Sequence, residues 1–351
     1  MTSAAMTTLT VAALLPRCGL SAVLDISPTY LVVLGRGTLP PVPAANLTTF
    51  VHDALFYAGD EEFVRGTEPF IRAGLDAGEG ILVVVQTSKI ELLRDALGRD
   101  VASVDFKDMN EVGRNPGCII PVWRDFVSQH STRAVRGIGE PVWPERTTVE
   151  LAECHQHEGL LNVAFADSAP WALLCPYDVV ALAPSVVEDA RRTHPHFVEQ
   201  GERSSSSTFD QHSADLWLSA PLPAAPSSAD LITFDSGSSR AVRARLSQYA
   251  SDVGFSEQRA ADIVLAVNEL VANSLEHGAG AGTFTMWRDQ RSLICEVYDA
   301  GRLHDPLVGR RRPEPNDAGG RGLWVANQLS DLTQLRCSPT GTRVRLHFTL
   351  D

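Results

Sequence analysis

Three polar residues recur every four positions in the run VLAVNELVANSLEHG: Glu269, Asn273 and His277. At this spacing they lie along one face of an α-helix, beside an apolar stripe formed by the neighbouring valines and leucines. A carboxylate one turn before an amide suits a magnesium nucleotide, because the amide oxygen can bind the ion and the carboxylate can accept a proton. A solvated helix face would explain the same residues.

Asp299 stands at the end of a strand-like segment, directly after CEVY, and precedes Gly301 by two residues. Its carboxylate could accept a hydrogen bond from an exocyclic amine while the backbone turns sharply. An ordinary turn is the alternative interpretation.

Glycines stand at two further places along this half of the chain. The run GGRGL, which contains Gly320, Arg321 and Gly322, opens a helix-like segment, where backbone N–H groups can approach phosphate oxygens. Thr342 follows a glycine before the last apolar segment, where a hairpin turn is an equal explanation. Each motif is weak alone, but their order and spacing together predict a nucleotide site.

The elements that must hold these residues follow from hydrophobic periodicity. In the second half of the chain we expect two helices, two strands, a polar loop, a helix and two strands, preceded by a short strand. This order favours an α+β sandwich whose mixed sheet is covered on one face. The expected strands are 231–234, 282–287, 293–298, 332–337 and 343–350, and the expected helices are 238–253, 256–277 and 322–329.

The first half alternates between strand-like and helix-like segments, which predicts a layered α/β domain. The β-branched run at 81–85 is typical of a strand buried on both faces of a parallel sheet. No GxxxxGK[ST] phosphate loop occurs. The other expected strands are 52–58, 134–138 and 171–175, and the expected helices are 60–77, 90–97 and 149–165.

The chain of 351 residues has room for two domains. We expect a poorly ordered extension at 1–46, a first domain at 47–200, a Ser- and Pro-rich linker without regular elements at 201–229, and a second domain at 230–351. The formal charge of −13 argues against direct nucleic-acid binding and leaves protein partners open. Six scattered cysteines, no bilayer-length apolar run and no charged signal-peptide start favour a cytoplasmic protein with reduced thiols.

The second half resembles the GHKL superfamily of histidine kinase-like ATPases. ELVANSLEHG is similar to the N box, DAG to the G1 box, GGRGL to the G2 box and the final GT to the closing motif. The resemblance covers residues 231–351 and implies a Bergerat-type α/β sandwich that binds ATP and Mg²⁺. It implies a general base at Glu269, a magnesium ligand at Asn273, adenine contacts from Asp299, Gly301 and Thr342, and phosphate contacts from Gly320 and Gly322, with His277 and Arg321 also at the nucleotide.

Within this superfamily the chain resembles the anti-sigma-factor serine kinases of bacterial stress and sporulation switches, whose N box also ends in a His-Gly pair, here His277 and Gly278. That resemblance implies a homodimer that sequesters a sigma factor and phosphorylates Ser or Thr of an anti-sigma-factor antagonist, and so regulates transcription. Arg321 departs from the pattern, since the kinases usually have an apolar or small residue there. Arg310, Arg311 and Arg312 lie in the loop that forms the family's lid. One of them could contact the γ-phosphate, but a solvated basic run is the preferred interpretation.

Three alternatives stay open. The domain could sequester a partner in an ATP-dependent way without kinase activity, or it could be an orphan histidine-kinase-type protein. No phosphoacceptor histidine on a helical hairpin precedes the domain, since His212 lies in the expected linker. The third alternative is a relic that has lost its nucleotide.

The first half resembles the MEDS sensory domain over residues 52–195, through HDALFYAGDEEF, PFIRAGLDAGEGILVVV, RGIGEPVWP, ECHQHEGLLNVAF and WALLCPYD. The resemblance implies a RecA-like α/β sandwich. Within it, Cys154 and His157 stand three apart on the expected helix and could share a metal with Cys175. A partly buried helix without a metal is the preferred interpretation.

Overall fold

The computed structural model describes residues 49–314 and 320–350. The expected extension at 1–46 and Gly319 of the G2-like run lie outside the described residues. Within the described part of the chain, no helix combines the length and the apolar character that crossing a bilayer requires.

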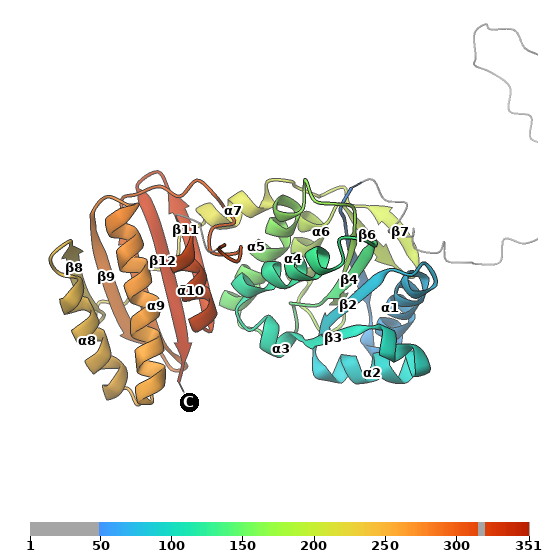
Figure 1. Ribbon diagram of the computed structural model, residues 1–351, viewed down its shortest axis with the longest axis horizontal. Coiled ribbons are helices and arrows are strands. Elements are labelled where there is room, and N and C mark those ends of the chain that lie inside the picture. Colours follow the sequence, from blue (N-terminus) through green and yellow to red (C-terminus); the bar gives the residue numbers. More distant parts are fainter. Residues whose placement is uncertain (1–48, 315–319, 351) are drawn as a thin grey trace, which may run out of the picture. The chain divides into compact units, whose positions relative to one another are not determined.

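The N-terminal domain is a parallel sheet with one antiparallel edge (Figure 1). Its strands lie in the order β3-β2-β4-β5-β1-β6-β7, and only the β6–β7 pair is antiparallel. This sheet of the N-terminal domain is therefore a mixed sheet, with parallel pairs and one antiparallel pair. Its elements are β1 (Val51–Tyr57), α1 (Gly59–Asp76), β2 (Gly80–Val85), α2 (Thr87–Leu97), the 3₁₀ helix η3 (Gly98–Ser103), β3 (Asp105–Asp108), α3 (Met109–Val112), the 3₁₀ helix η4 (Pro116–Cys118), α4 (Ile119–Gln129), β4 (Val135–Gly139), α5 (Thr148–Ala164), β5 (Ala172–Asp178), α6 (Pro184–Thr193), β6 (His196–Glu199) and β7 (Glu202–Ser205).

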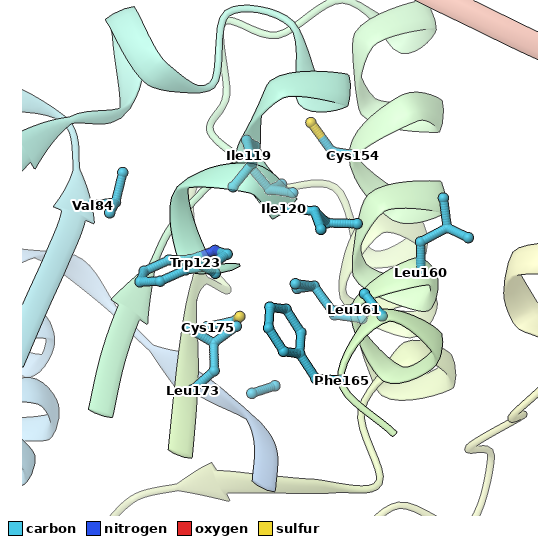
Figure 2. Packing of buried hydrophobic residues seen from close by; sticks show 14 of the residues in the cluster. Val84, Ile119, Ile120, Trp123, Cys154, Leu160, Leu161, Phe165, Leu173 and Cys175 are labelled. Atoms are coloured by element: carbon cyan, nitrogen blue, oxygen red, sulfur yellow. The ribbon is translucent and has the colours of Figure 1, made fainter. Parts of the chain in front are cut away.

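Helices cover both faces of this sheet, which explains why β2 is apolar throughout. Leu82 and Val84 of β2 pack into the cluster formed with α4, α5 and α6, part of which Figure 2 shows around Trp123 and Phe165. The alternate residues of β2 pack on the other face, against α1 and α2. Successive side chains of a strand point to opposite faces, so a strand between two helical layers buries every residue.

The helix that contains the CHQH run is fixed locally at its start. Thr147 and Glu150 form a reciprocal capping box, with Thr147 N–H donating to Glu150 Oε2 at 2.7 Å and Glu150 N–H donating to Thr147 Oγ1 at 3.3 Å. Such a box satisfies backbone donors that the first helical turn leaves unpaired. It sets where α5 begins and therefore which of its residues face the sheet.

All seven helices and strands expected in this domain are present, and the layered α/β prediction is confirmed. The structure adds elements that periodicity did not reveal. β3 is a short polar edge strand, and α4 carries Pro121 in its first turn, where the missing N–H needs no partner.

The expectation that 201–229 contains no regular element is wrong. β7 joins the sheet as its antiparallel edge, and a seven-residue helix, α7 (Ser213–Ser219), follows. Trp217 of α7 stacks on His155 with ring centroids 5.7 Å apart, and Leu218 packs with the core of the C-terminal domain. Ser-rich composition alone therefore did not distinguish a linker from an edge strand and a short docked helix.

The C-terminal domain is a five-stranded sheet in the order β11-β12-β10-β9-β8 (Figure 1). Every pairing in it is antiparallel, so the mixed sheet expected here is corrected to an antiparallel one. The α+β order of elements is confirmed. The elements are β8 (Asp230–Asp235), α8 (Ser239–Asp252), α9 (Glu257–Glu276), β9 (Ala281–Arg288), β10 (Ser292–Asp299), α10 (Arg321–Leu329), β11 (Leu332–Ser338) and β12 (Gly341–Thr349).

The helices of this domain pack on one face of its sheet. Leu293, Cys295 and Val297 alternate along β10 and pack into one cluster with α8, α9 and α10. Glu296 points to the opposite face, where Arg345 donates to its carboxylate at 2.6 Å. The period of two along the strand therefore places Asp299, the last residue of β10, on the helix-covered face with Leu293, Cys295 and Val297.

Candidate nucleotide site

Helix α9 presents the residues of the N-box-like run. Ser256 caps it, accepting the N–H of Arg259 at 3.2 Å. The apolar residues of α9 are buried against the sheet, whereas Glu269 and Asn273, one turn apart, are half-buried. The periodicity thus gives what the sequence predicts, a polar stripe beside an apolar one.

The Asp299 carboxylate is held at both oxygens by short hydrogen bonds. Ser274 Oγ donates to Oδ2 at 2.7 Å, and the backbone N–H of Gly301 donates to Oδ1 at 2.7 Å. Both donors are neutral, so the carboxylate is oriented while its charge remains available to a ligand donor. Ser274 was missed by the sequence reasoning. It stands directly after Asn273, but its partner is 25 residues away and no motif letter marks it.

Glycines line this group because side chains would not fit. A Cβ on Gly278 would lie 2.5 Å from Asp299 Oδ1, and a Cβ on Gly301 would lie 2.6 Å from the same atom. On the other side, a Cβ on Gly322 would lie 2.6 Å from Asn273 Nδ2. In the structure, Asn273 therefore lies beside the start of α10, and Asp299 lies beside the loop that follows α9.

Thr342 closes the group from β12. It lies opposite Asp299 in the antiparallel β10–β12 register, and its Oγ1 donates to the carbonyl of Gly301 at 2.9 Å. Thr342 is buried. The hairpin-turn alternative for the GT motif accounts for part of this arrangement, since β11 and β12 are joined there, and the hydroxyl bond to Gly301 is a further constraint.

Helix α10 begins at the second glycine motif. Gly320 is its N-cap with φ 81°, in the left-handed region that glycine adopts without steric cost. The first backbone N–H groups of such a helix have no intrahelical acceptor and can bind anions. Arg321 is exposed, and its Nη2 donates to the carbonyl of Glu314 at 3.4 Å.

Two residues considered in the sequence analysis lie outside the group around Asp299 and Asn273. His277 is the exposed C-cap of α9, and its Nε2 lies 3.9 Å from the Glu276 carboxylate. Arg310 is buried at 5% exposure, which overturns the solvated-run interpretation for that residue. Its neighbour Arg311 is exposed and pairs with Asp305 at 2.9 Å.

The donor set fits a magnesium nucleotide. Asp299 offers an oriented acceptor of the kind that could bind the adenine amine, and Gly278 and Gly301 let the backbone pack closely against it. Asn273 offers an amide oxygen, a hard ligand of the kind Mg²⁺ takes, directly beside Gly322 at the start of α10. Glu269 stands one turn away, at the position from which a carboxylate could accept a proton.

Two hollows of the described surface lie away from this group. One, of about 450 Å³, is lined by residues of α1 and η3, including Arg72 and Asp100. The other, of about 600 Å³, lies between α8 and α9, against Ser247 and Leu265. Neither is lined by Asn273 or Asp299, so the convergent contacts, rather than concavity, identify the candidate site.

Comparison with known proteins identifies both domains. Residues 51–195 match the family model of MEDS, the MEthanogen/methylotroph, DcmR Sensory domain. Residues 232–348 match the family model of the histidine kinase-like ATPase domain. The chain therefore contains a MEDS domain followed by a histidine kinase-like ATPase domain, as the resemblances predicted.

Among solved structures, the chain is similar to the RsbU and RsbW domains of Rv1364c from Mycobacterium tuberculosis. The identity is 23%, the TM-score is 0.27, and the similarity covers 36% of this chain and 34% of that chain. The two family matches, rather than this structural likeness, identify the domains.

Proposed function

We propose that this chain, a MEDS domain joined to a histidine kinase-like ATPase domain, is an ATP-dependent regulator that phosphorylates Ser or Thr of an anti-sigma-factor antagonist and sequesters a sigma factor. The observation that supports ATP binding is the constrained Asp299 carboxylate, which Ser274 and Gly301 hold by hydrogen bonds and against which Gly278 and Gly301 pack closely. The partners rest on the resemblance of the N box to the anti-sigma-factor kinases.

Each residue of the candidate site has a separate role in this proposal. Asp299 binds the adenine amine, Ser274 keeps its carboxylate in orientation, and Thr342 supports the Gly301 turn. Asn273 holds the ion, and the N-terminal turn of α10 binds phosphate oxygens through backbone N–H groups. When bound, ATP supplies the phosphoryl group and Mg²⁺ neutralises its charge. Glu269 accepts the proton of the attacking Ser or Thr hydroxyl at a carboxylate oxygen.

ATP binding is tested by titration calorimetry of the full chain with and without Mg²⁺. We expect wild-type protein to bind ATP in a magnesium-dependent way and Asn273→Ala to lose that dependence. Asn268→Ala is the matched control, because Asn268 is a half-buried amide of the same helix that bonds to Arg243 instead. No binding by the wild type would exclude the whole proposal and favour the relic.

Phosphotransfer is tested with labelled ATP and purified candidate antagonists. We expect acid-stable label on the antagonist, lost in Glu269→Gln while ATP binding is retained, and preserved in the exposed control Glu276→Gln. Acid-labile label would instead support the orphan histidine-kinase-type protein. Binding of ATP and partner without any transfer would support the sequestering module.

A further inference from the structure

Four side chains with metal-binding atoms meet inside the N-terminal domain. They come from four elements: His52 from β1, Glu158 from α5, Cys175 from β5 and His194 from the residue after α6. All four are at most 2% exposed. One ligand atom from each lies within 4.8 Å of all the others. Figure 2 shows Cys175 inside the core, near Leu173 and Phe165.

Four of the six separations between these ligand atoms are close to those around a tetrahedral ion. Glu158 Oε2 lies 3.0 Å from His52 Nε2, 3.5 Å from His194 Nε2 and 3.5 Å from Cys175 Sγ. Cys175 Sγ lies 3.4 Å from His52 Nε2. Around a zinc ion with bonds of about 2.0 Å to N and O and about 2.3 Å to S, tetrahedral ligand atoms are separated by roughly 3.3–3.6 Å.

The outer nitrogens of both imidazoles are already occupied. His194 Nδ1 lies 2.8 Å from the carbonyl oxygen of Ala190, which only accepts, so the proton is on Nδ1. His52 Nδ1 lies 3.1 Å from Asn162 Oδ1, and the amide of Asn162 is oriented by its donation to the carbonyl of Thr193 at 2.8 Å. In the neutral rings both Nε2 atoms therefore present lone pairs. Ligating histidines are held in this way by their second nitrogen.

These lone pairs face the oxygen of a carboxylate, which is also an acceptor, so a positive species is required between them. A single proton can satisfy only one of the two imidazole contacts. Within the described residues, His194 Nε2 and Glu158 Oε1 are buried without a hydrogen-bond partner. One divalent cation would engage both rings, the carboxylate and the sulfur together.

Charge balance favours the same species. Two neutral imidazoles, one carboxylate and one thiolate carry two negative charges, which a divalent ion cancels. A neutral complex is the form that a buried apolar site tolerates, since an isolated charge there is strongly destabilising. In the metal-free protein Cys175 Sγ donates to Glu158 Oε2 at 3.5 Å, so the sulfur carries the proton that metal binding would release.

We propose that His52, Glu158, Cys175 and His194 form a closed tetrahedral site for one divalent transition-metal ion of the zinc class. Binding forms a metal–sulfur bond and releases the Cys175 thiol proton to solvent, with no change of oxidation state. The mixed N, S and O donor set suits zinc, and four protein ligands are typical of a site that stabilises a fold.

The site differs from the metal alternative suggested by the CHQH run. Cys154 and His157 are buried, as the preferred interpretation predicted, and Cys154 Sγ donates to the carbonyl of Pro141 at 3.2 Å. Of that alternative, only Cys175 belongs to the cluster. Its other members come from three distant parts of the sequence.

The test uses the full chain, stripped with a chelator under reducing conditions and titrated with Co²⁺. We expect one ion per chain, the intense visible bands of tetrahedral cobalt and a thiolate-to-cobalt charge-transfer band. Cys175→Ser removes the charge-transfer band, whereas Cys154→Ser, a matched substitution of a buried thiol, keeps it. Asn162→Ala, which frees the second nitrogen of His52, weakens Zn²⁺ binding by about 10- to 100-fold.

A measurement on wild-type protein removes any dependence on the folding of variants. In partially denaturing solution, Zn²⁺ should slow alkylation of Cys175 far more than that of Cys154, as mapped by mass spectrometry. The proposal is overturned if wild-type protein binds no Co²⁺, if the bound cobalt is octahedral, or if Zn²⁺ protects both thiols equally. It is also overturned if Cys175→Ser retains the charge-transfer band.

Discussion

The ATPase group around Asp299 and the buried cluster around Glu158 both centre on one carboxylate, yet their surroundings are opposite. Asp299 is half-buried and receives two neutral donors, Ser274 and Gly301. Glu158 is fully buried and faces two imidazole nitrogens with a thiol nearby. In the first group, both carboxylate oxygens have hydrogen-bond donors within the protein, and the carboxylate is partly exposed. The second is closed to solvent and lacks a positive charge.

The difference teaches how a carboxylate's role follows from its neighbours. Burial alone would raise the pKa of Glu158, yet the two imidazoles of His194 and His52 beside it hold that pKa well below its ordinary range. A carboxylate kept ionised in an apolar core needs a cationic partner, whereas one at a domain surface can keep part of its hydration. The following experiments test that contrast, from the largest expected effect to the smallest.

Removing the buried carboxylate should have the largest effect. Glu158→Ala deletes the common partner of His52 and His194 and leaves a cavity, so we expect the free energy of unfolding to fall by about 3–5 kcal/mol. Urea unfolding followed by the fluorescence of the core residues Trp123 and Trp171 measures it. The exposed control Glu188→Ala should leave the midpoint unchanged. Equal midpoints for the two variants would show that Glu158 contributes nothing to stability.

The surface carboxylate should matter for binding and little for stability. Asp299→Asn keeps the shape of the side chain but removes its charge, and hydrogen bonds to charged groups contribute about 1.5–3 kcal/mol. We therefore expect ATP affinity to fall roughly 10- to 100-fold in titration calorimetry. Asp252→Asn, at the exposed end of α8, is the control. Unchanged affinity in Asp299→Asn would break the comparison, because Asp299 would then not contact the nucleotide.

A half-buried histidine of the C-terminal domain, His347, sharpens the contrast because its partner is an amide. Its Nε2 lies 3.0 Å from Gln334 Oε1, and burial, followed by the nearby charge of Arg345, lowers its pKa to about 4 from 6.5. The unfolded chain therefore binds more protons than the folded one as the pH falls below 6.5, and stability is lost toward about pH 4. The slope is about 1.4 kcal/mol per pH unit at most.

Hydrogen exchange of β11 and β12 peptides at several pH values, corrected for intrinsic rates, measures this loss. His347→Gln should flatten the pH dependence between pH 6.5 and about 4, while the exposed control His304→Gln should not. The same steep acid response in both variants would mean that other groups are responsible.

The smallest effect concerns orientation of the surface carboxylate. Ser274→Ala removes one hydrogen bond to the Asp299 carboxylate but leaves its charge in place, so ATP affinity should fall by only about 2- to 10-fold. Ser251→Ala, an exposed serine of α8, is the control. A loss as large as that of Asp299→Asn would indicate that Ser274 contacts the nucleotide directly.

Local periodicity predicted most of the elements, and it failed where the signal was not local. The strand β3 is polar and short, and β7 lies within a serine-rich stretch, so neither shows a hydrophobic period. The parallel and antiparallel pairings were also beyond it, because register depends on which strands meet. The C-terminal sheet, expected as mixed, is antiparallel for that reason.

The sequence by itself determined that Glu269 and Asn273 share a helix face and that Gly301 follows a strand-end aspartate by two residues, because helical spacing and chain order are local properties. Only the tertiary structure decided that Ser274 orients Asp299, and that His52, Glu158, Cys175 and His194 meet. The four residues of the cluster are separated by up to 142 positions in the chain, from 52 to 194. Packing α5 and α6 against the sheet brings them together, and no spacing rule along the sequence encodes that arrangement.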